Sequence, residues 1–359
     1  MKTREPRRLI WDSGTAYDFF QSLLVLHQPG RFGVRGAWTA GMRARLTPAA
    51  RRTLEQAQRV IRPPVHWIYT LPPPKDVETA LWSLSQIPAE KRLATLALRY
   101  DAPPADVAEM LQRVAAQGKW GKDDLALLRA HLEARHPNRK RSLSEEACSE
   151  ILAVWARAGE FGEEYLTALR NYHAAFFREE EQRISSALEA ALARAQALAE
   201  QLPLPDLLEE LSQGVRIDEP LLGEEVVLVP SYWITPLVML VSISSTCRLC
   251  LFGARPATDS LVPGETVPEA LLRALKALSD PTRLKILRYL ARAPLTPTEL
   301  ARELRLRTPT VMHHLHALRL AGLVQVMIGT GEERKRYALR PNAPAEVGRM
   351  LAAYLEEDR

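Results

Sequence analysis

The chain has 359 residues, of which 47% are apolar and 25% are charged, and its formal net charge at pH 7 is +5. These values are ordinary for a globular protein of two or three domains with a sizeable core. Three cysteines exclude a disulfide framework, and no apolar run is long enough for a membrane span or a secretory signal, so we expect a cytoplasmic protein without a membrane partner.

The positive charge is confined to the last quarter of the chain. Residues 265–359 contain 16 Lys and Arg against 11 Asp and Glu, whereas residues 1–264 contain 32 of each kind. A basic module attached to a neutral one is typical of a nucleic-acid-binding domain joined to a partner domain. We therefore predict two domains, with the boundary between residues 264 and 265.

The N-terminal domain is predicted to be mostly helical. A short strand near Leu9 precedes a helix over residues 15–26, and from residue 48 to about 202 apolar residues recur at helical spacing between proline breaks. Residues 165–200 contain neither glycine nor proline. This stretch predicts one long helix, and the charged run at residues 178–183 is the place where we expect it to kink.

Residues 224–254 have a different pattern. Apolar runs at 226–229, 237–241 and 248–252 predict short strands, with a turn at 242–246. The expected fold class is therefore mainly α (α+β), with a helical N-terminal domain that contains a small β-sheet. This domain would act as a sensor or as a dimerisation scaffold.

Two patterns in the N-terminal domain have the residue types of a metal or redox site. Cys247 and Cys250 form a C-x-x-C pair, but positions i and i+3 of a strand point to opposite faces, so we interpret them as buried thiols. His131 and His136 do not have the four-residue spacing of a zinc-protease helix. The basic residues 139–141 are interpreted as part of a surface loop, with a second nucleic-acid contact as the alternative.

Catalytic and nucleotide-binding motifs are missing from the sequence. No G-x-S-x-G, Walker-type loop, H-E-x-x-H or dinucleotide fingerprint occurs. We therefore predict no enzymatic activity, no catalytic residues, no cofactor and no metal. The aromatic patches at residues 67–69 and 232–233 leave two interpretations open, because they could line a ligand pocket or fill the core.

Residues 280–340 carry the most specific pattern. Asp280 and Pro281 suit the N-cap and the first position of a helix, and an apolar stripe follows at residues 284, 286, 287, 290 and 291. Residues 296–299 have the spacing of a capping box, which predicts a second short helix. A third helix is expected from Thr308 to Leu320.

The third helix has an apolar face and a polar face. At 100° per residue the inward face comprises Val311, His314, Leu315 and Leu318, and the outward face comprises Pro309, His313 and His316. His314 is predicted to be a core histidine with a satisfied hydrogen bond. No acidic residue occurs from 308 to 320, which suits a helix that enters a groove lined by phosphates.

Two short strands are predicted after the third helix. They cover residues 323–328 and 334–339 around a turn at 329–332, and the second begins with three consecutive cations. A β-hairpin with a basic flank beside such a helix is typical of the wing of a winged helix-turn-helix, which contacts backbone phosphates.

The sequences LSDPTR (278–283) and PTVMHHLHALRLAGLV (309–324), together with the hairpin, resemble the winged-helix domain of ArsR-type bacterial transcriptional regulators. The resemblance covers residues 268–356 and implies double-stranded DNA as the partner. It also implies a homodimer formed by the helices at 268–278 and 345–356. Arg307 and Met312 stand where such regulators commonly have serine, and the helix at 296–304 has no cysteine, so neither their DNA sequence preference nor their metal sensing is implied.

We therefore predict a transcriptional regulator, of the repressor type, that reads promoter DNA as a dimer. Thr310, His313 and His316 would contact base edges or the sugar-phosphate backbone, Arg305, Arg307 and Arg319 would contact phosphates, and the wing would add Thr330, Arg334 and Arg336. The complete set of predicted DNA-binding residues is Arg305, Arg307, Thr308, Thr310, Met312, His313, His316, Arg319, Thr330, Arg334, Lys335 and Arg336.

Lys335 alternates with its neighbours along the strand, so it is expected to point elsewhere. A small-molecule effector is left open. The alternative is an enzyme or ligand-binding protein whose winged helix binds another protein, and the uneven charge of the two domains argues against it.

Overall fold

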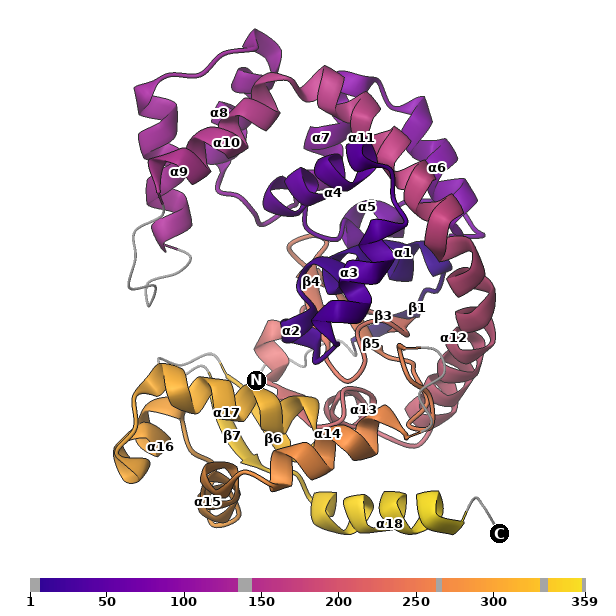
Figure 1. Cartoon of the computed structure of the whole chain (residues 1–359), viewed down its shortest axis with the longest axis vertical. Helices are drawn as coiled ribbons and strands as arrows, with labels where there is room; N and C mark the ends of the chain where they lie inside the picture. The colour runs from indigo at the N-terminus through magenta and orange to yellow at the C-terminus, as the bar shows by residue number, and fades with distance from the viewer. Residues whose placement is uncertain (1–6, 135–143, 263–266, 330–334, 357–359) are drawn as a thin grey trace.

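The computed structural model describes residues 7–134, 144–262, 267–329 and 335–356. Helices dominate it, as Figure 1 shows, and the predicted mainly α (α+β) class is confirmed. The N-terminal helices are α1 (Thr15–His27), α2 (Pro29–Phe32), α3 (Gly36–Ala44), α4 (Pro48–Val60), α5 (Val65–Tyr69), α6 (Val77–Gln86), α7 (Ala89–Ala97), α8 (Ala105–Gln117), α9 (Lys122–Ala134), α10 (Glu145–Ala156), α11 (Ala158–Tyr172), α12 (Arg178–Ala199) and α13 (Leu204–Leu211).

The remaining elements are short strands and the C-terminal helices. The strands are β1 (Arg8–Trp11), β2 (Val215–Ile217), β3 (Glu225–Ser231), β4 (Met239–Ser242), β5 (Cys247–Gly253), β6 (Val324–Ile328) and β7 (Lys335–Leu339). A 3₁₀ turn covers Glu219–Leu221. The C-terminal helices are α14 (Glu269–Leu278), α15 (Pro281–Leu290), α16 (Pro297–Leu304), α17 (Thr308–Leu320) and α18 (Ala343–Glu356).

Side-chain caps explain where several of these helices begin. The side chains of Thr47, Asp76, Ser144, Asp280 and Thr296 each accept a hydrogen bond from the backbone N–H three residues later. A cap of this kind satisfies an N–H that has no partner within the helix and contributes about 1 kcal/mol. The residue types that predicted the starts of α15 and α16 therefore act as predicted.

A four-stranded sheet divides the apolar interior into two cores. Its order is β1-β3-β5-β4, with β1, β3 and β5 parallel and β4 antiparallel to β5. One face packs on the N-terminal helices, and the other packs on α13 and on the C-terminal helices. Cys247 belongs to the first core and Cys250 to the second, and both are buried free thiols, as the strand geometry predicted.

A second sheet crosses the predicted domain boundary. Strand β2 pairs in parallel with β6, so the hairpin of β6 and β7 becomes a three-stranded sheet. The sequence did not predict β2, because three residues are too few to show a period-two pattern. The parts on either side of residue 264 thus share a sheet and a core.

The predicted long helix is continuous but contains one irregular turn. Helix α11 runs through a π-helical turn, His173–Phe177, directly into α12. This turn lies immediately before the charged run where a kink was predicted. Glu181 accepts hydrogen bonds from the backbone N–H of Val77 at 3.2 Å and from the Thr15 hydroxyl, so it ties α12 to α1 and α6.

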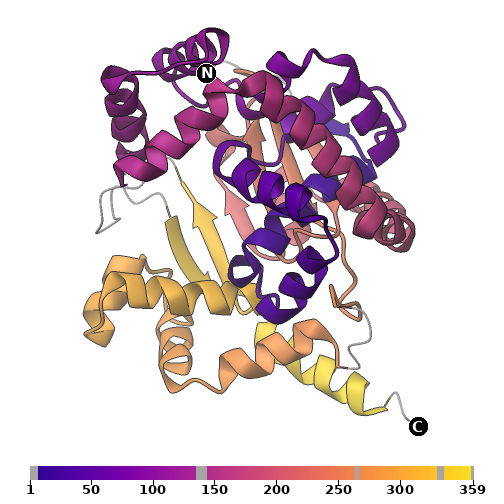
Figure 2. The same ribbon diagram turned by 45° about the horizontal axis from the view of Figure 1, so that its top comes forward.

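The molecule is curved. In Figures 1 and 2, α8, α9 and α10 lie at one end and α15, α16 and α17 at the other, with α1 to α3 between them. Within the described residues, none of the helices combines the length and the apolar character that a membrane span requires.

Candidate nucleic-acid interface

Helices α15, α16 and α17 form a helix-turn-helix around a small apolar core. Ile286, Leu300, Val311 and Leu315 are fully buried between them. The predicted stripe on α15 was wrong for Leu284, which is 49% exposed, and for Ala291, which is exposed at the end of the helix. Two positions along a helix correspond to a rotation of about 200°, so Leu284 lies opposite Ile286.

The turn between α16 and α17 is short because its first residue is left-handed. Arg305 has a φ of 55°, and the backbone N–H of Leu306 donates to the carbonyl of Ala301 at 2.9 Å, which closes the end of α16. The side chains of Arg305 and Arg307 are exposed in this turn. Two cations therefore lie directly before the start of α17.

The first half of α17 presents its polar face to solvent. Pro309, Thr310, Met312 and His313 are exposed, and Thr308 is half-buried at the helix start. Side chains in this position of a helix-turn-helix reach base edges in the major groove. The four exposed residues form a surface without an acidic group, as predicted.

The wing differs from its predicted arrangement. Arg336 was expected to act through the wing, but it donates to the Glu299 carboxylate at 3.1 Å, beside the capping box of α16. Lys335 was expected to point in another direction than its neighbours, and its side chain is exposed and lies over the Tyr337 ring at 5.6 Å. Because side chains alternate along a strand, one of the two cations faces α16 and the other is exposed. Thr330 and Arg334 lie outside the described residues.

Comparisons with known proteins assign the helix-turn-helix to a family. A family model described as bacterial regulatory protein, arsR family, matches residues 280–326. Residues 280–326 therefore form an ArsR-type helix-turn-helix, and we refer to them as the ArsR-family segment. The assignment marks it as the DNA-binding helix-turn-helix of a transcription regulator.

A solved structure titled as an ArsR family transcriptional regulator is 31% identical to this chain. The alignment covers 24% of this chain and 94% of the other, with a TM-score of 0.22, so the assignment rests on the family model. A search of curated proteins finds no match to the chain.

The prediction for Arg319, in the ArsR-family segment, was wrong. Arg319 was expected to contact phosphate, but it is only 6% exposed. Its guanidinium donates to the carbonyls of Ser212 at 2.6 Å, Gln213 at 3.1 Å and Pro236 at 3.1 Å. Burial lowers the pKa of Arg319 to about 10. Its charge ties the second half of α17 to the N-terminal part of the chain and is not available to DNA in this structure.

The histidines of α17 have three different environments. His313 is exposed, as predicted, whereas His316 is half-buried, and its ring makes a hydrogen bond to the backbone of Arg31. Burial lowers the pKa of both His316 and His314. His314 was predicted to have a satisfied hydrogen bond. Its ring nitrogen Nδ1, however, is buried and has no hydrogen-bond partner among the described residues.

Sequence reasoning missed that α2 flanks α17. The Arg273 guanidinium donates to the carbonyl of Phe32 at 3.0 Å, and Leu320 approaches Gly33. A signal was present, because residues 19–54 contain six arginines and no acidic residue. Arg31 and Arg35 in this basic segment are exposed, so cations from the N-terminal part adjoin the ArsR-family segment.

The aromatic patches of the N-terminal part belong to the core. Tyr232 and Trp233 are fully buried, and the Trp233 ring stacks on Trp38 at 6.3 Å. Trp67 is also buried, with its ring edge-on to Phe20 at 6.3 Å. Of the two interpretations left open, the structure favours core packing.

Proposed function

We propose that this chain is a transcriptional regulator that reads promoter DNA through the first half of α17, as a homodimer, and represses by blocking the promoter. The observation that carries the proposal is the exposed, acid-free start of α17 within an ArsR-family helix-turn-helix. A regulator of this kind would act in the cytoplasm.

In this proposal the residues of α17 divide into two roles. Thr310, Met312 and His313 reach base edges in the major groove, where hydroxyl and imidazole groups hydrogen-bond and a thioether contacts a thymine methyl. Arg305 and Arg307, directly before α17, contact phosphates, and the Thr308 hydroxyl donates a further hydrogen bond to a phosphate. These cations fix the position of the helix on the duplex without reading its sequence.

Cations outside the helix-turn-helix extend the phosphate contacts. Lys335 is exposed on β7, and Arg31 adjoins α17 through His316. Each cation that meets a phosphate releases a counterion from the duplex, so affinity gains a term that weakens with salt.

The dimer proposal rests on exposed leucines of the C-terminal helices. Leu275 of α14, Leu284 of α15, and Leu351 and Leu355 of α18 are 36% to 66% exposed. A two-fold dimer would bury such apolar side chains and present two α17 helices to two half-sites. Sedimentation equilibrium of the full chain should then give twice the chain mass. A monomer at micromolar concentration would contradict this part of the proposal.

A specific surface supports the alternative function, in which the winged helix binds another protein. A hollow of about 550 Å³ between α15 and α16 is lined by residues that include Lys285, Arg288, Arg292 and Glu303. A winged helix that binds another protein would use a surface of this kind. None of its lining residues belongs to α17, so substitutions of the lining cations and of the exposed α17 residues would separate the two functions.

Fluorescence anisotropy tests the proposal. A labelled duplex from immediately upstream of the gene is titrated with the chain, and a scrambled duplex is the comparison. We expect about 10³-fold tighter binding to the upstream duplex. Thr310→Ala combined with His313→Ala should reduce that preference by about 30-fold or more, since each base contact is worth about 1–3 kcal/mol.

Thr167→Ala is the matched control, because Thr167 is exposed on α11, away from α17. It should leave both affinities unchanged. Equal binding to the two duplexes would contradict promoter reading. A lack of binding to either at low salt would overturn the proposal and favour the protein-binding alternative.

A further inference from the structure

The basic segment at residues 19–54 extends beyond α2 to α3 and the start of α4. It contains six arginines, and the acidic residues that flank it are Asp18 and Glu55. Asp18 is fully buried, so it does not neutralise the surface of this segment. Residues 1–264 as a whole contain equal numbers of basic and acidic residues, so the basic segment concentrates positive charge in one place.

Three of these arginines have side chains that do not pair with another group of the chain. Within the described residues, no hydrogen bond or ion pair is found for the side chains of Arg31, Arg43 and Arg45. Arg31 and Arg45 are exposed, and Arg43 is half-buried. Arg35, by contrast, interacts with another residue of the chain. The first three arginines can therefore pair with an external anion.

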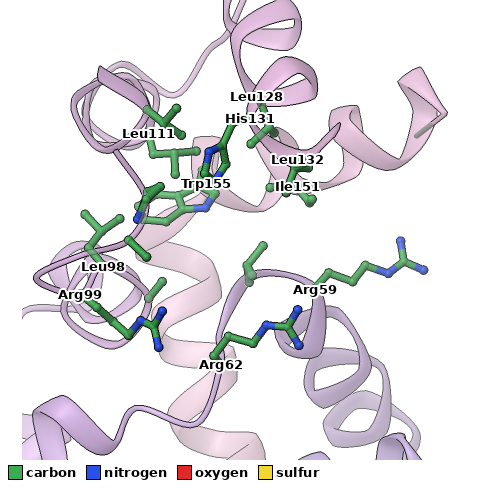
Figure 3. Close-up of a pocket in the computed structure, with 15 residues that line it drawn as sticks. Arg59, Arg62, Leu98, Arg99, Leu111, Leu128, His131, Leu132, Ile151 and Trp155 are labelled. Atoms are coloured by element: carbon green, nitrogen blue, oxygen red, sulfur yellow. The ribbon is translucent and has the colours of Figure 1, made fainter. Parts of the chain in front are cut away.

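The positive charge is offset further along α4. Arg51 and Arg52 lie about one turn before Glu55, whose charge opposes theirs. Arg59 forms an ion pair with a glutamate of α10, and Arg62 also interacts within the chain. Figure 3 shows both of these arginines beside a pocket that the ends of several helices line. The surface with unpaired cations is therefore that of α2 and α3.

This surface lies beside the face of α17 that is proposed to read DNA. His313 and His316 are one turn apart on the outward face of α17, and the His316 ring makes a hydrogen bond to the backbone of Arg31. A duplex whose major groove receives His313 therefore lies directly beside α2. Figure 1 shows α17, α2 and α3 in succession from the lower part of the molecule to its middle.

Arg43 is close to the start of α2. Burial lowers the pKa of His27, the last residue of α1, and the charge of Arg43 lowers this pKa further. His27 is two residues before Pro29, where α2 begins. Glu55 also acts on His27, but among the described residues no ion pair joins Glu55 to Arg43. Arg43 and α2 thus belong to one continuous surface.

Helix α3 has an outer face with small side chains. Thr39 and Met42 are buried, and Trp38 is half-buried with its ring stacked on Trp233 of the core. The exposed residues before Arg45 are Gly36, Ala37, Ala40, Gly41 and Ala44. A phosphate backbone can approach such a face closely, whereas a protein partner would find no large apolar anchor on it. The nine residues of α3 span about 14 Å, which corresponds to about four phosphates of one DNA strand.

We propose that the duplex bound at α17 continues along α2 and α3, where Arg43 and Arg45 contact phosphates that flank the sequence read by α17. Arg31 connects the two parts of this surface. The contacts are to the DNA backbone alone, so they add affinity without sequence preference. This inference rests on the proposed function, and it extends the DNA that the chain covers beyond the helix-turn-helix.

Salt-dependent anisotropy with the full chain tests the flanking contacts. The upstream duplex is prepared in two lengths. One is trimmed to the shortest duplex that is preferred over scrambled DNA, and the other has one helical turn of about 10 base pairs added at each end. Each phosphate contact adds about 0.9 to the slope of log affinity against log salt, so the wild-type slope should be steeper by about two on the long duplex.

A double variant assigns this difference to α3. Arg43→Gln with Arg45→Gln should remove the difference, and it should leave the slope on the trimmed duplex and the preference over scrambled DNA unchanged. Arg170→Gln with Arg178→Gln is the matched control. Both arginines are exposed on α11 and α12, which form the outer edge of the molecule in Figure 1, and within the described residues their side chains have no hydrogen bond or ion pair. The control should leave both slopes unchanged. Thermal melting confirms that each variant is folded.

Two results would overturn the inference. They are equal wild-type slopes on the two duplexes, or equal changes of slope in the Arg43 and Arg45 variant and in the control. A failure of the proposed function would be recognised separately, because the upstream and scrambled duplexes would then bind equally well at either length.

Discussion

Asp18 is a carboxylate held completely inside the N-terminal part. It accepts hydrogen bonds from the Ser231 hydroxyl at 2.6 Å and from the backbone N–H groups of Tyr232 at 3.0 Å and Trp233 at 2.9 Å. Burial outweighs these bonds and raises the pKa of Asp18 to about 6. Asp18 thus fixes the segment after β3 at an electrostatic cost that grows as the carboxyl ionises.

The raised pKa predicts a pH dependence of stability. The folded chain holds the Asp18 proton more tightly than the unfolded chain, so this stabilisation is complete below pH 4 and is lost as pH rises through 6. In Asp18→Asn this pH dependence is removed. The unfolding free energy of Asp18→Asn minus that of the wild type should therefore increase by about 2 kcal/mol between pH 4 and pH 7.

Urea denaturation at several pH values measures this shift. Asp123→Asn, which changes an exposed carboxylate on α9, provides the comparison for the removal of a surface charge. A difference between Asp18→Asn and wild type that stays constant with pH would refute the assigned pKa.

For single residues, the sequence predicted which side of a helix a residue lies on, but not which distant residues contact it. The helical wheel of α17 placed Val311 and Leu315 in the core, as found. It could not show that α2 covers His316 or that three carbonyls from other segments bind Arg319. Such contacts come from residues 83 or more positions away, and no local pattern contains them.

At the scale of elements, the crossing of α11 and α7 depends on one glycine. A Cβ at Gly162 would overlap the backbone carbonyl of Ala89, whereas a Cβ at Gly159, one turn earlier, would meet Glu90 at an ordinary 3.7 Å. The two helices can therefore approach closely only where Gly162 lies. Burial of Gly162 agrees with this role.

This difference predicts opposite effects of one substitution at two positions of α11. Gly162→Ala should destabilise the chain by about 2 kcal/mol or more, because a backbone must move in a packed core. Gly159→Ala should be neutral or stabilise by up to about 1 kcal/mol, since alanine is the better helix former. Thermal and urea unfolding of both variants measure these stability changes. Equal melting temperatures of the two variants would contradict the close approach of the helices at Gly162.

Elements with strong local signals were predicted well. Helices α15, α16 and α17 begin at capping residues or prolines, so their starts followed from the sequence. Strand β2 and the π-helical turn were not predicted, because one is set by pairing with β6 and the other by the contacts of a long helix with its neighbours. Local patterns do not encode either cause.

At the scale of the molecule, the ArsR-family segment is built into the chain rather than attached to it. Strand β2 extends the sheet of the wing, and Ala195, Leu207 and Phe252 share a core with α15, α16 and α17. The charge pattern predicted a basic module and a neutral one, but not this shared core. The proposed DNA surface accordingly extends from α17 onto the basic segment at α2.

The salt dependence of DNA binding tests that surface most directly. Anisotropy titrations across a salt series give the slope of log affinity against log salt, whose magnitude decreases by about 0.9 for each phosphate that a variant no longer neutralises. Arg305→Gln, Arg307→Gln and Arg31→Gln should each reduce the slope by about one. Arg170→Gln, on the exposed face of α11, should not. Unchanged slopes in the first three variants, or an equal reduction in Arg170→Gln, would contradict the proposed DNA-binding surface.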